Sequence, residues 1–300
     1  MTSPKAYAGR LASDKVFDLV TVVYAKELPY LEIQAKSIEQ YVPLEQISSI
    51  IVIINDDIPN HSIDPSWYGT ARHKLIIKNY KELDVNIQLD GWNSQQLCKL
   101  LATNHATSTW SMILDAKTWF VRSFNAGMVL DQGKIKRHFT EPSDFFSGEQ
   151  TFIEQLYGIS FKSTVRCGVP FYIHNKTCKD LLKSIENFVD FFQKNVKNPH
   201  NVTEFLLYIG FLIHNDITDT LYSDGYEFSD INVADWQYNE FDQLLTEARN
   251  DIRVITFSLN SVAYVELSDE QINDWLEFLK DRHLINDLVS TRNKLNTLYN

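Results

Sequence analysis

Three short runs of β-branched and apolar residues in the first half of the chain constrain the fold most strongly. They are Phe17–Tyr24 (FDLVTVVY), Ser49–Ile54 (SIIVII) and Trp110–Leu114 (WSMIL). Continuous apolar runs of this length predict strands that are buried on both faces, because a strand with one wet face alternates apolar and polar residues. The chain is therefore expected to enclose a buried sheet.

The segments between these runs show helical spacing. Tyr30–Val42 and Gly91–His105 each place apolar residues on one helical face, and Pro43 ends the first of them. Leu75–Lys78 adds a shorter strand, so the elements follow the order β-α-β-β-α-β. Such alternation predicts an α/β fold with a mostly parallel sheet, right-handed crossovers and flanking helices.

The second half is expected to be less regular, with a helical C-terminal appendage. The predicted elements are loops over Asp131–Gly148, a short helix over Glu149–Tyr157, a strand over Gly168–His174, helices over Lys179–Asn195 and Thr203–Asn215, and a helical tail capped by Ser268. We predict an N-terminal tail over 1–16, one continuous α/β domain over 17–265 with halves at 17–125 and 126–265, and a C-terminal helical segment over 266–300.

Charge and cysteine content narrow the function classes. Thirty-nine acidic against 28 basic residues give a net charge of −11, which disfavours binding to nucleic acid or to an anionic membrane surface. The longest apolar stretches, Ile50–Ile54 and Phe205–Ile213, are far shorter than the ~20 residues of a spanning helix. Cys98, Cys167 and Cys178 form no CxxC pair, so reduced thiols and a cytoplasmic location are expected.

Polar residues follow three of the predicted strands. Tyr24 and Lys26 follow the first, Asn55 to Asp57 the second, and Asp115 to Lys117 the last. Ligands of open parallel sheets bind outside the carboxyl ends of the strands, so these residues are expected to share one site. An Asp at a strand end is more often a turn former, so Asp115 alone is a weak indication of a site. The neighbouring Lys117 adds a cation, which suits a phosphate.

The predicted helix Gly91–His105 offers a second polar group. Gln95, Gln96 and Lys99 share one face because they are three and four residues apart. That face is either solvated or packed around an anionic ligand beside Asp115, and the spacing allows both.

Several common catalytic motifs are missing from the sequence. It holds no GxGxxG or GxxxxGK[ST] loop and no GxSxG nucleophile turn, which disfavours a Rossmann dehydrogenase, a P-loop kinase and an α/β-hydrolase. Most tryptophans are expected in the core, with Trp92 and Trp119 as exceptions beside the site.

The ordered set FDLVTVVYAKE, IIVIINDD, GWNSQQLCKLLA and WSMILDAKTWFVRSF resembles the nucleotide-binding half of GT-A-type glycosyltransferases. The likeness is closest to a small bacterial and phage-borne group whose sugar specificities are mostly unassigned. It runs from Asp18 to Asn125, with weaker echoes over Thr203–Gly210 (TEFLLYIG) and Arg253–Tyr264. It implies that 17–125 is the nucleotide-sugar half and 126–265 the acceptor half, in a cytoplasmic enzyme, or one in the host cytoplasm if a phage encodes it.

The resemblance implies transfer of a sugar from a nucleoside diphosphate sugar, with UDP expected, to an unknown sugar, lipid or protein acceptor. Asp115 matches the first carboxylate of an Asp-x-Asp motif that meets the ribose and a divalent cation, Mn²⁺ or Mg²⁺. Glu204 matches an acceptor-side carboxylate, the expected base if the reaction inverts, and His174 and His214 are further candidates on that side. The expected nucleotide-sugar contacts are Tyr24, Lys26, Asn55, Asp56, Asp57, Trp92, Gln95, Gln96, Lys99, Asp115, Ala116 and Lys117.

Two positions depart from the family pattern. Lys117 replaces the second Asp of Asp-x-Asp, and Asn260 stands where such enzymes often carry a His for the metal or phosphate. Either Lys117 supplies charge to the diphosphate and partly replaces a metal, or Asp115, the phosphates and water hold the cation, with Asn260 as the other expected ligand. The rival interpretations are an inactive nucleotide-sugar-binding protein of the same fold and a nucleotidyltransferase, the latter disfavoured because AKELP after the first strand lacks glycine.

Overall fold

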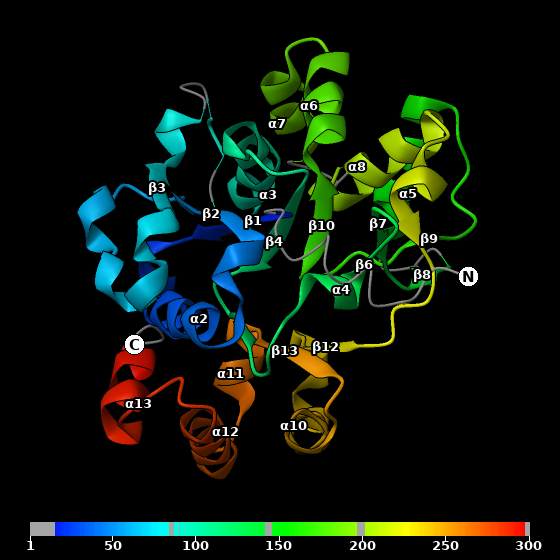
Figure 1. The fold of residues 1–300 in the computed structure, drawn as a ribbon. Helices are drawn as coiled ribbons and strands as arrows, with labels where there is room; N and C mark the ends of the chain where they lie inside the picture. The colour runs from blue at the N-terminus through cyan, green and yellow to red at the C-terminus, as the bar shows by residue number, and fades with distance from the viewer. Residues whose placement is uncertain (1–15, 84–86, 90, 142–145, 197–201, 298–300) are drawn as a thin grey trace.

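A mostly parallel sheet forms the centre of the molecule, as predicted (Figure 1). The computed structural model describes residues 16–83, 87–89, 91–141, 146–196 and 202–297. Residues 1–15 of the predicted N-terminal tail lie outside the described residues. The strand order is β10-β4-β1-β2-β3. The parallel strands are β1 (Phe17–Val23), β2 (Ile47–Ile54), β3 (Leu75–Asn79) and β4 (Trp110–Asp115), and β10 (Phe171–His174) runs antiparallel to β4.

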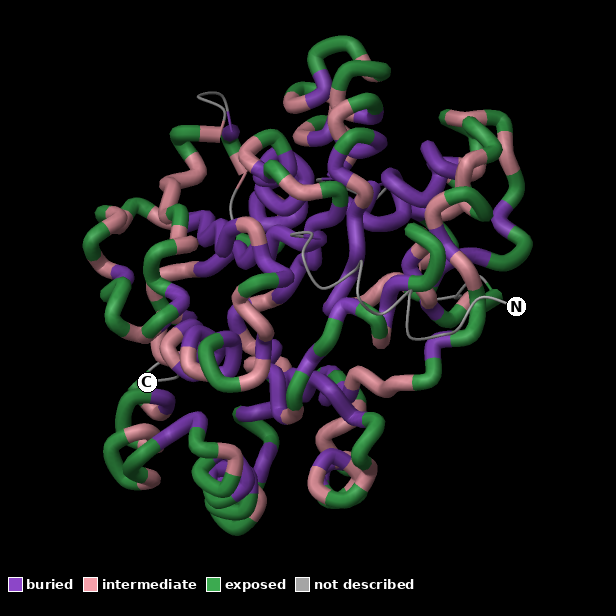
Figure 2. The backbone as a smooth tube through the Cα atoms, viewed as in Figure 1, coloured by how far each residue is buried: buried purple, intermediate pink, exposed green. Residues whose placement is uncertain are grey.

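Two helices of the first half position the site. α3 (Gly91–Ala102) packs on β1 and β2, and α2 (Leu28–Tyr41) follows β1. α2 joins two hydrophobic clusters, because Leu31 and Ala35 pack in the cluster of the central sheet whereas Tyr30 and Ile33 pack in a second cluster. Figure 2 shows the central strands buried and the outer helical surfaces exposed.

The second cluster surrounds a smaller sheet that was not predicted from the sequence. Its order is β12-β13-β5, formed by β12 (Ser229–Val233), β13 (Val254–Leu259) and β5 (Thr118–Phe120). The helices around it are α10 (Phe241–Asn250), α11 (Ser261–Glu266), α12 (Asp269–Asp281) and α13 (Leu288–Asn296). The predicted cap of the helical tail is confirmed, since Ser268 Oγ accepts from Gln271 N at 3.2 Å.

The loops expected over Asp131–Gly148 are in part short strands, which corrects the prediction. The elements of this region and its partners are α4 (Ala126–Val129), β6 (Leu130–Asp131), β7 (Lys134–Lys136), β8 (Phe139–Thr140), α5 (Ser147–Tyr157), β9 (Thr164–Val165), α9 (Thr218–Leu221) and β11 (Tyr222–Ser223). β7 pairs with β11 and β8 with β9. These partners lie far along the chain, so local polarity gave no sign of the pairing.

The helix expected over Lys179–Asn195 is two helices, a second correction. They are α6 (Asn175–Ser184) and α7 (Phe188–Val196), followed by α8 (Glu204–His214). Asn187 adopts a left-handed φ of 50°, which an α-helix does not accommodate, and the chain turns there.

Trp119 lies in the second cluster rather than beside a site, a third correction. Its ring is fully buried against Trp275, and its Nε1 donates to the Tyr30 carbonyl at 3.2 Å. The three cysteines are free thiols, as expected. Every helix in the described residues is too short or too polar to cross a bilayer.

Candidate functional site

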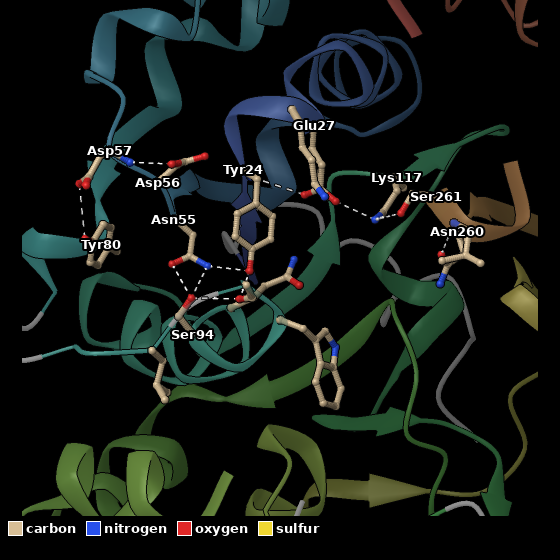
Figure 3. Close-up of a pocket in the computed structure, with 16 residues that line it drawn as sticks. Tyr24, Glu27, Asn55, Asp56, Asp57, Tyr80, Ser94, Lys117, Asn260 and Ser261 are labelled. Carbon is tan, nitrogen blue, oxygen red and sulfur yellow. Dashed lines mark hydrogen bonds and ion pairs between the residues drawn. The ribbon is translucent and has the colours of Figure 1, made fainter. Parts of the chain in front are cut away.

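A cavity of about 610 Å³ opens at the carboxyl ends of β1, β2 and β3 (Figure 3). We call it the strand-end cavity. Each strand contributes the residues that directly follow it: Tyr24, Lys26 and Glu27 after β1, Asn55, Asp56 and Asp57 after β2, and Tyr80 after β3. The rest of the lining comes from α3 and its approach, the turn after β4 and the start of α11: Leu89, Gly91, Trp92, Ser94, Gln95, Lys117, Asn260, Ser261 and Val262.

A hydrogen-bond network joins the first two strand ends to α3. Asn55 Nδ2 donates to the Tyr24 hydroxyl at 2.9 Å and to Ser94 Oγ at 2.8 Å, and the Tyr24 hydroxyl donates to the Gly91 carbonyl. Burial raises the pKa of Tyr24 above its usual range, so the hydroxyl stays protonated. Gly91 has a φ of 50°, a conformation that other residues rarely adopt. The network therefore fixes this side of the cavity before any ligand binds.

The opposite side of the cavity carries an ion pair from the turn after β4. Lys117 Nζ lies 2.7 Å from Glu27 Oε1 and donates to Ser261 Oγ at 3.4 Å (Figure 3). The Lys117 side chain thus lines the cavity. Its charge is balanced by Glu27, a residue that was not predicted from the sequence.

The two aspartates after β2 differ in their surroundings. Asp56 holds the turn, since its Oδ2 accepts from Ala25 N at 3.2 Å and its Oδ1 from Asp57 N at 2.8 Å. Asp57 lies 2.5 Å from Lys81 Nζ, and this hydrogen bond holds the pKa of Asp57 below its usual range. Asp57 is the more exposed of the two and remains within reach of a ligand.

Lys99, Asp115 and Glu204 form a buried ion cluster beside the strand-end cavity rather than in its lining. Lys99 Nζ lies 2.9 Å from Asp115 Oδ1 and 3.1 Å from Glu204 Oε1. Burial alone would lower the pKa of Lys99, but the two carboxylates raise it above its usual range. Burial alone would raise the pKa of Asp115, and Lys99 holds it below the usual range instead. Lys99 and Asp115 thus stay charged together. Glu204 is buried, and the Asp115 side chain is 31% exposed.

Gln34 of α2 fixes the turn that carries Asp115 and Lys117. Its Nε2 donates to the Asp115 carbonyl at 2.6 Å and to the Thr118 carbonyl at 2.9 Å, while its Oε1 accepts from Thr21 at 2.8 Å. This residue was not predicted from the sequence, although a glutamine within the apolar face of a predicted helix was a signal for it.

The remaining expected contacts lie beneath the cavity. Ala116 is fully buried, and the Gln96 side chain is buried with its Oε1 accepting from Glu204 N at 3.3 Å. Tyr80 was also not predicted, although it follows the third predicted strand and the strand-end rule would have found it. Ser261 and Val262 gave no such signal because β13 was not predicted.

The residues expected to bind a cation do not fit one in this arrangement. Asp115 Oδ1 faces the Lys99 ammonium at 2.9 Å, and Asn260 Oδ1 accepts from Val262 N at 2.9 Å as the cap of α11. Among the described residues, no group of three or more His, Cys, Asp and Glu side chains is placed to hold a metal ion. His174 and His214 also turn elsewhere, bonding Thr177 at 2.8 Å and the Tyr157 carbonyl at 2.9 Å.

The fold is similar to that of a solved glycosyltransferase, WbbM. The bifunctional glycosyltransferase WbbM matches with a TM-score of 0.51 and 8% identity, over 89% of this chain and 50% of that chain, so the chain spans half the length of WbbM. Galactosyltransferase LgtC (TM-score 0.46, 13% identity, 81% of this chain and 86% of that chain) and GlyE from Streptococcus pneumoniae TIGR4 (0.47, 13%, 94% and 63%) are also similar. The match to WbbM and the mostly parallel sheet flanked by helices together show the GT-A-like α/β fold that the sequence predicted.

The sequence itself assigns the chain to a family. Residues 16–249 match a family of unknown function, DUF6492, and the chain belongs to that family. The comparison with curated proteins gives no match.

Proposed function

We propose that the chain is a glycosyltransferase that moves a sugar from a nucleoside diphosphate sugar, with UDP as the nucleotide, to an acceptor hydroxyl. The observation that carries the proposal is the strand-end cavity, where side chains from three parallel strands meet α3 and Lys117. Its volume of about 610 Å³ lies within the roughly 300–1,000 Å³ of small-molecule sites. The GT-A-like fold supports the same class of reaction.

The nucleoside fits the side of the cavity that the hydrogen-bond network fixes. The Asp57 carboxylate and the Tyr24 hydroxyl oxygen accept hydrogen bonds from base and ribose groups, and Asn55, whose amide donates to Tyr24 and Ser94, holds that hydroxyl in place. Trp92 and Tyr80 offer aromatic faces, and stacking a base on such a face contributes about 1–3 kcal/mol. The preformed network lowers the cost of ordering these groups when the nucleotide binds.

The diphosphate fits the opposite side. Lys26 and Lys117 are the cations of the cavity lining, and Lys117 must exchange its contact with Glu27 for one with phosphate oxygens. A cation at this place stabilises the negative charge that develops on the leaving diphosphate. Mn²⁺ or Mg²⁺ remains an expectation from the family resemblance. Because the expected ligands are otherwise engaged, no step of this proposal passes through a metal.

The transfer forms one bond and breaks one. The acceptor oxygen bonds to the anomeric carbon, the bond from that carbon to the diphosphate oxygen breaks, and the electron pair leaves with the diphosphate. The acceptor proton passes to a carboxylate, and we assign this role to Asp115 because its side chain is partly exposed. Glu204, the base expected from the sequence, is a positioning residue in this proposal because it is buried against Lys99.

Release of UDP from a panel of UDP-sugars tests the proposal. We expect one donor to give free sugar and UDP slowly in the absence of acceptor, and Asp115→Asn to abolish this release while calorimetry still detects UDP binding. Parallel reactions in EDTA and in MnCl₂ separate metal-dependent from metal-independent turnover. UDP binding without release from any donor would instead support the inactive binding protein. No UDP binding in either buffer would overturn both.

A further inference from the structure

A second cavity, of about 440 Å³, lies over β12 and the segment that precedes β10. Its lining differs from that of the strand-end cavity, and the two share no residue. It combines charged groups, side-chain amides and a tryptophan that is 64% exposed: Arg137, Arg166, Asp230, Asn232, Gln237 and Trp236. An aromatic surface with a few convergent polar groups is typical of a small-molecule site.

A buried ion pair forms part of this lining. Arg137 Nη1 lies 2.9 Å from Asp230 Oδ2, and the guanidinium is placed over the rings of Tyr172 and Tyr226. Asp230 Oδ1 also accepts from Thr256 Oγ1 at 2.9 Å. Arg137 is 4% exposed, and its buried Nε has no hydrogen-bond partner among the described residues. A buried donor in this state marks a position where an acceptor oxygen of a ligand or of water is expected.

The charge of the second cavity is opposite to that of the strand-end cavity. Arg137 and Arg166 against Asp230 leave one net positive charge in its lining. The strand-end cavity has two lysines against three carboxylates, and the whole chain has a net charge of −11. Guanidinium groups bind carboxylate and phosphate in a bidentate manner. The lining of the second cavity therefore suits a ligand that carries an anionic group.

The two cavities meet at the ends of the smaller sheet. Asn260, which follows β13, lines the strand-end cavity, whereas Ala234, which follows β12, lines the second. Asn260 N donates to the Val233 carbonyl at 3.0 Å, which joins these two strand ends. The joined ends of β12 and β13 therefore lie between a ligand in the second cavity and the proposed donor in the strand-end cavity.

We propose that the second cavity binds a saccharide bearing a carboxylate or phosphate group, and that this saccharide is the acceptor. The sugar ring stacks on Trp236, Asn232 and Gln237 meet its hydroxyls, and Arg166 meets its anionic group, with Arg137 beneath. The acceptor role rests on the proposed function, whereas the saccharide site stands on the cavity itself.

Saturation-transfer NMR on the full chain tests the site with methyl glucuronide and glucose 6-phosphate, and with methyl glucoside as the neutral sugar. We expect both acidic sugars to bind roughly tenfold more tightly than methyl glucoside, because the guanidinium contact is charge-assisted. Saturating UDP should leave their signals unchanged. Trp236→Ala should abolish them, and Arg166→Gln should reduce them to the level of methyl glucoside. Both side chains are exposed, so the fold is expected to survive.

Matched variants place the binding. Lys162→Gln removes an exposed cation near Arg166 in sequence, outside the cavity lining, and Trp92→Ala removes the tryptophan of the strand-end cavity. Neither should alter the signals of the acidic sugars. Signals that survive Trp236→Ala, or that UDP displaces, would overturn the site, and equal binding of all three sugars would overturn its preference for an anion. Intact sugar signals in a chain that binds no UDP would overturn the proposed function and the acceptor role, and would leave the saccharide site standing.

Discussion

The two cavities of this molecule are built in opposite ways. The strand-end cavity is polar, has more carboxylates than lysines, and is organised by hydrogen bonds between residues that directly follow parallel strands. The second cavity has more cations than carboxylates and is organised by the Arg137–Asp230 ion pair, which joins the residue after β7 to β12. The difference teaches that one fold can hold two neighbouring cavities of opposite net charge, to which we assign the proposed nucleotide and the proposed acceptor.

The largest effect is expected from Lys99→Met, which removes the ammonium of the buried ion cluster beside the strand-end cavity. Removing the ammonium leaves two carboxylates without their partner, which typically costs about 3–5 kcal/mol of the free energy of unfolding. Urea denaturation measures this change. The exposed pair Lys176–Asp180 provides the control, since Lys176→Met should leave the midpoint unchanged. Equal denaturation midpoints for the two variants would show that the buried ion cluster does not stabilise the fold.

Lys117→Met separates the two sides of the strand-end cavity. If Lys117 contacts the diphosphate, its loss should weaken UDP binding by roughly tenfold to a hundredfold, since a hydrogen bond to a charged group contributes about 1.5–3 kcal/mol. Uridine lacks the diphosphate and should bind the variant as it binds the wild type. Calorimetry with both ligands makes the comparison, and an equal loss for UDP and uridine would contradict the assignment.

Asp115→Asn tests whether the charge of Asp115 stabilises the ion cluster, through the dependence of stability on pH. The pKa of Asp115 is below its usual value in the folded chain, so its stabilisation is present above the unfolded pKa of about 3.9 and is lost as the pH falls through the folded pKa. The variant should be about 1 kcal/mol less stable than the wild type at pH 7. The gap should begin to close below about pH 4 and vanish once the pH is below the folded pKa of Asp115, whereas a gap that persists in stronger acid would assign the effect to packing.

The smallest effect is expected from a variant of the second cavity on UDP binding in the strand-end cavity. Trp236→Ala should change the dissociation constant of UDP by less than about twofold, because Trp236 lines the second cavity and is absent from the lining of the strand-end cavity. A larger change in a UDP titration would mean that the two cavities act as one site.

The strand-end cavity could be predicted because each of its strands has a continuous apolar sequence and ends in polar residues. The rule that ligands bind at the carboxyl ends of parallel strands is enough to bring Tyr24, Asn55 and Lys117 together. The sequence indicated that Lys99 could face Asp115, but it did not predict the ion pair with Glu204. Glu204 lies on α8, 105 residues from Lys99 along the chain.

The second cavity could not be predicted from the sequence. Arg137 lies in a segment that looks like a loop, and its partner Asp230 lies 93 residues away on a strand that was not predicted. Ion pairs at such separation leave no local pattern. The likeness to bacterial and phage-borne enzymes and the cytoplasmic location remain predictions from the sequence.

A crystal structure of the chain with UDP tests the central claim most directly. The account predicts density for the nucleoside beside Tyr24, Asn55 and Trp92, and for the diphosphate at Lys117 with the Glu27 contact broken. UDP bound elsewhere on the molecule, with the strand-end cavity filled only by water, would contradict it.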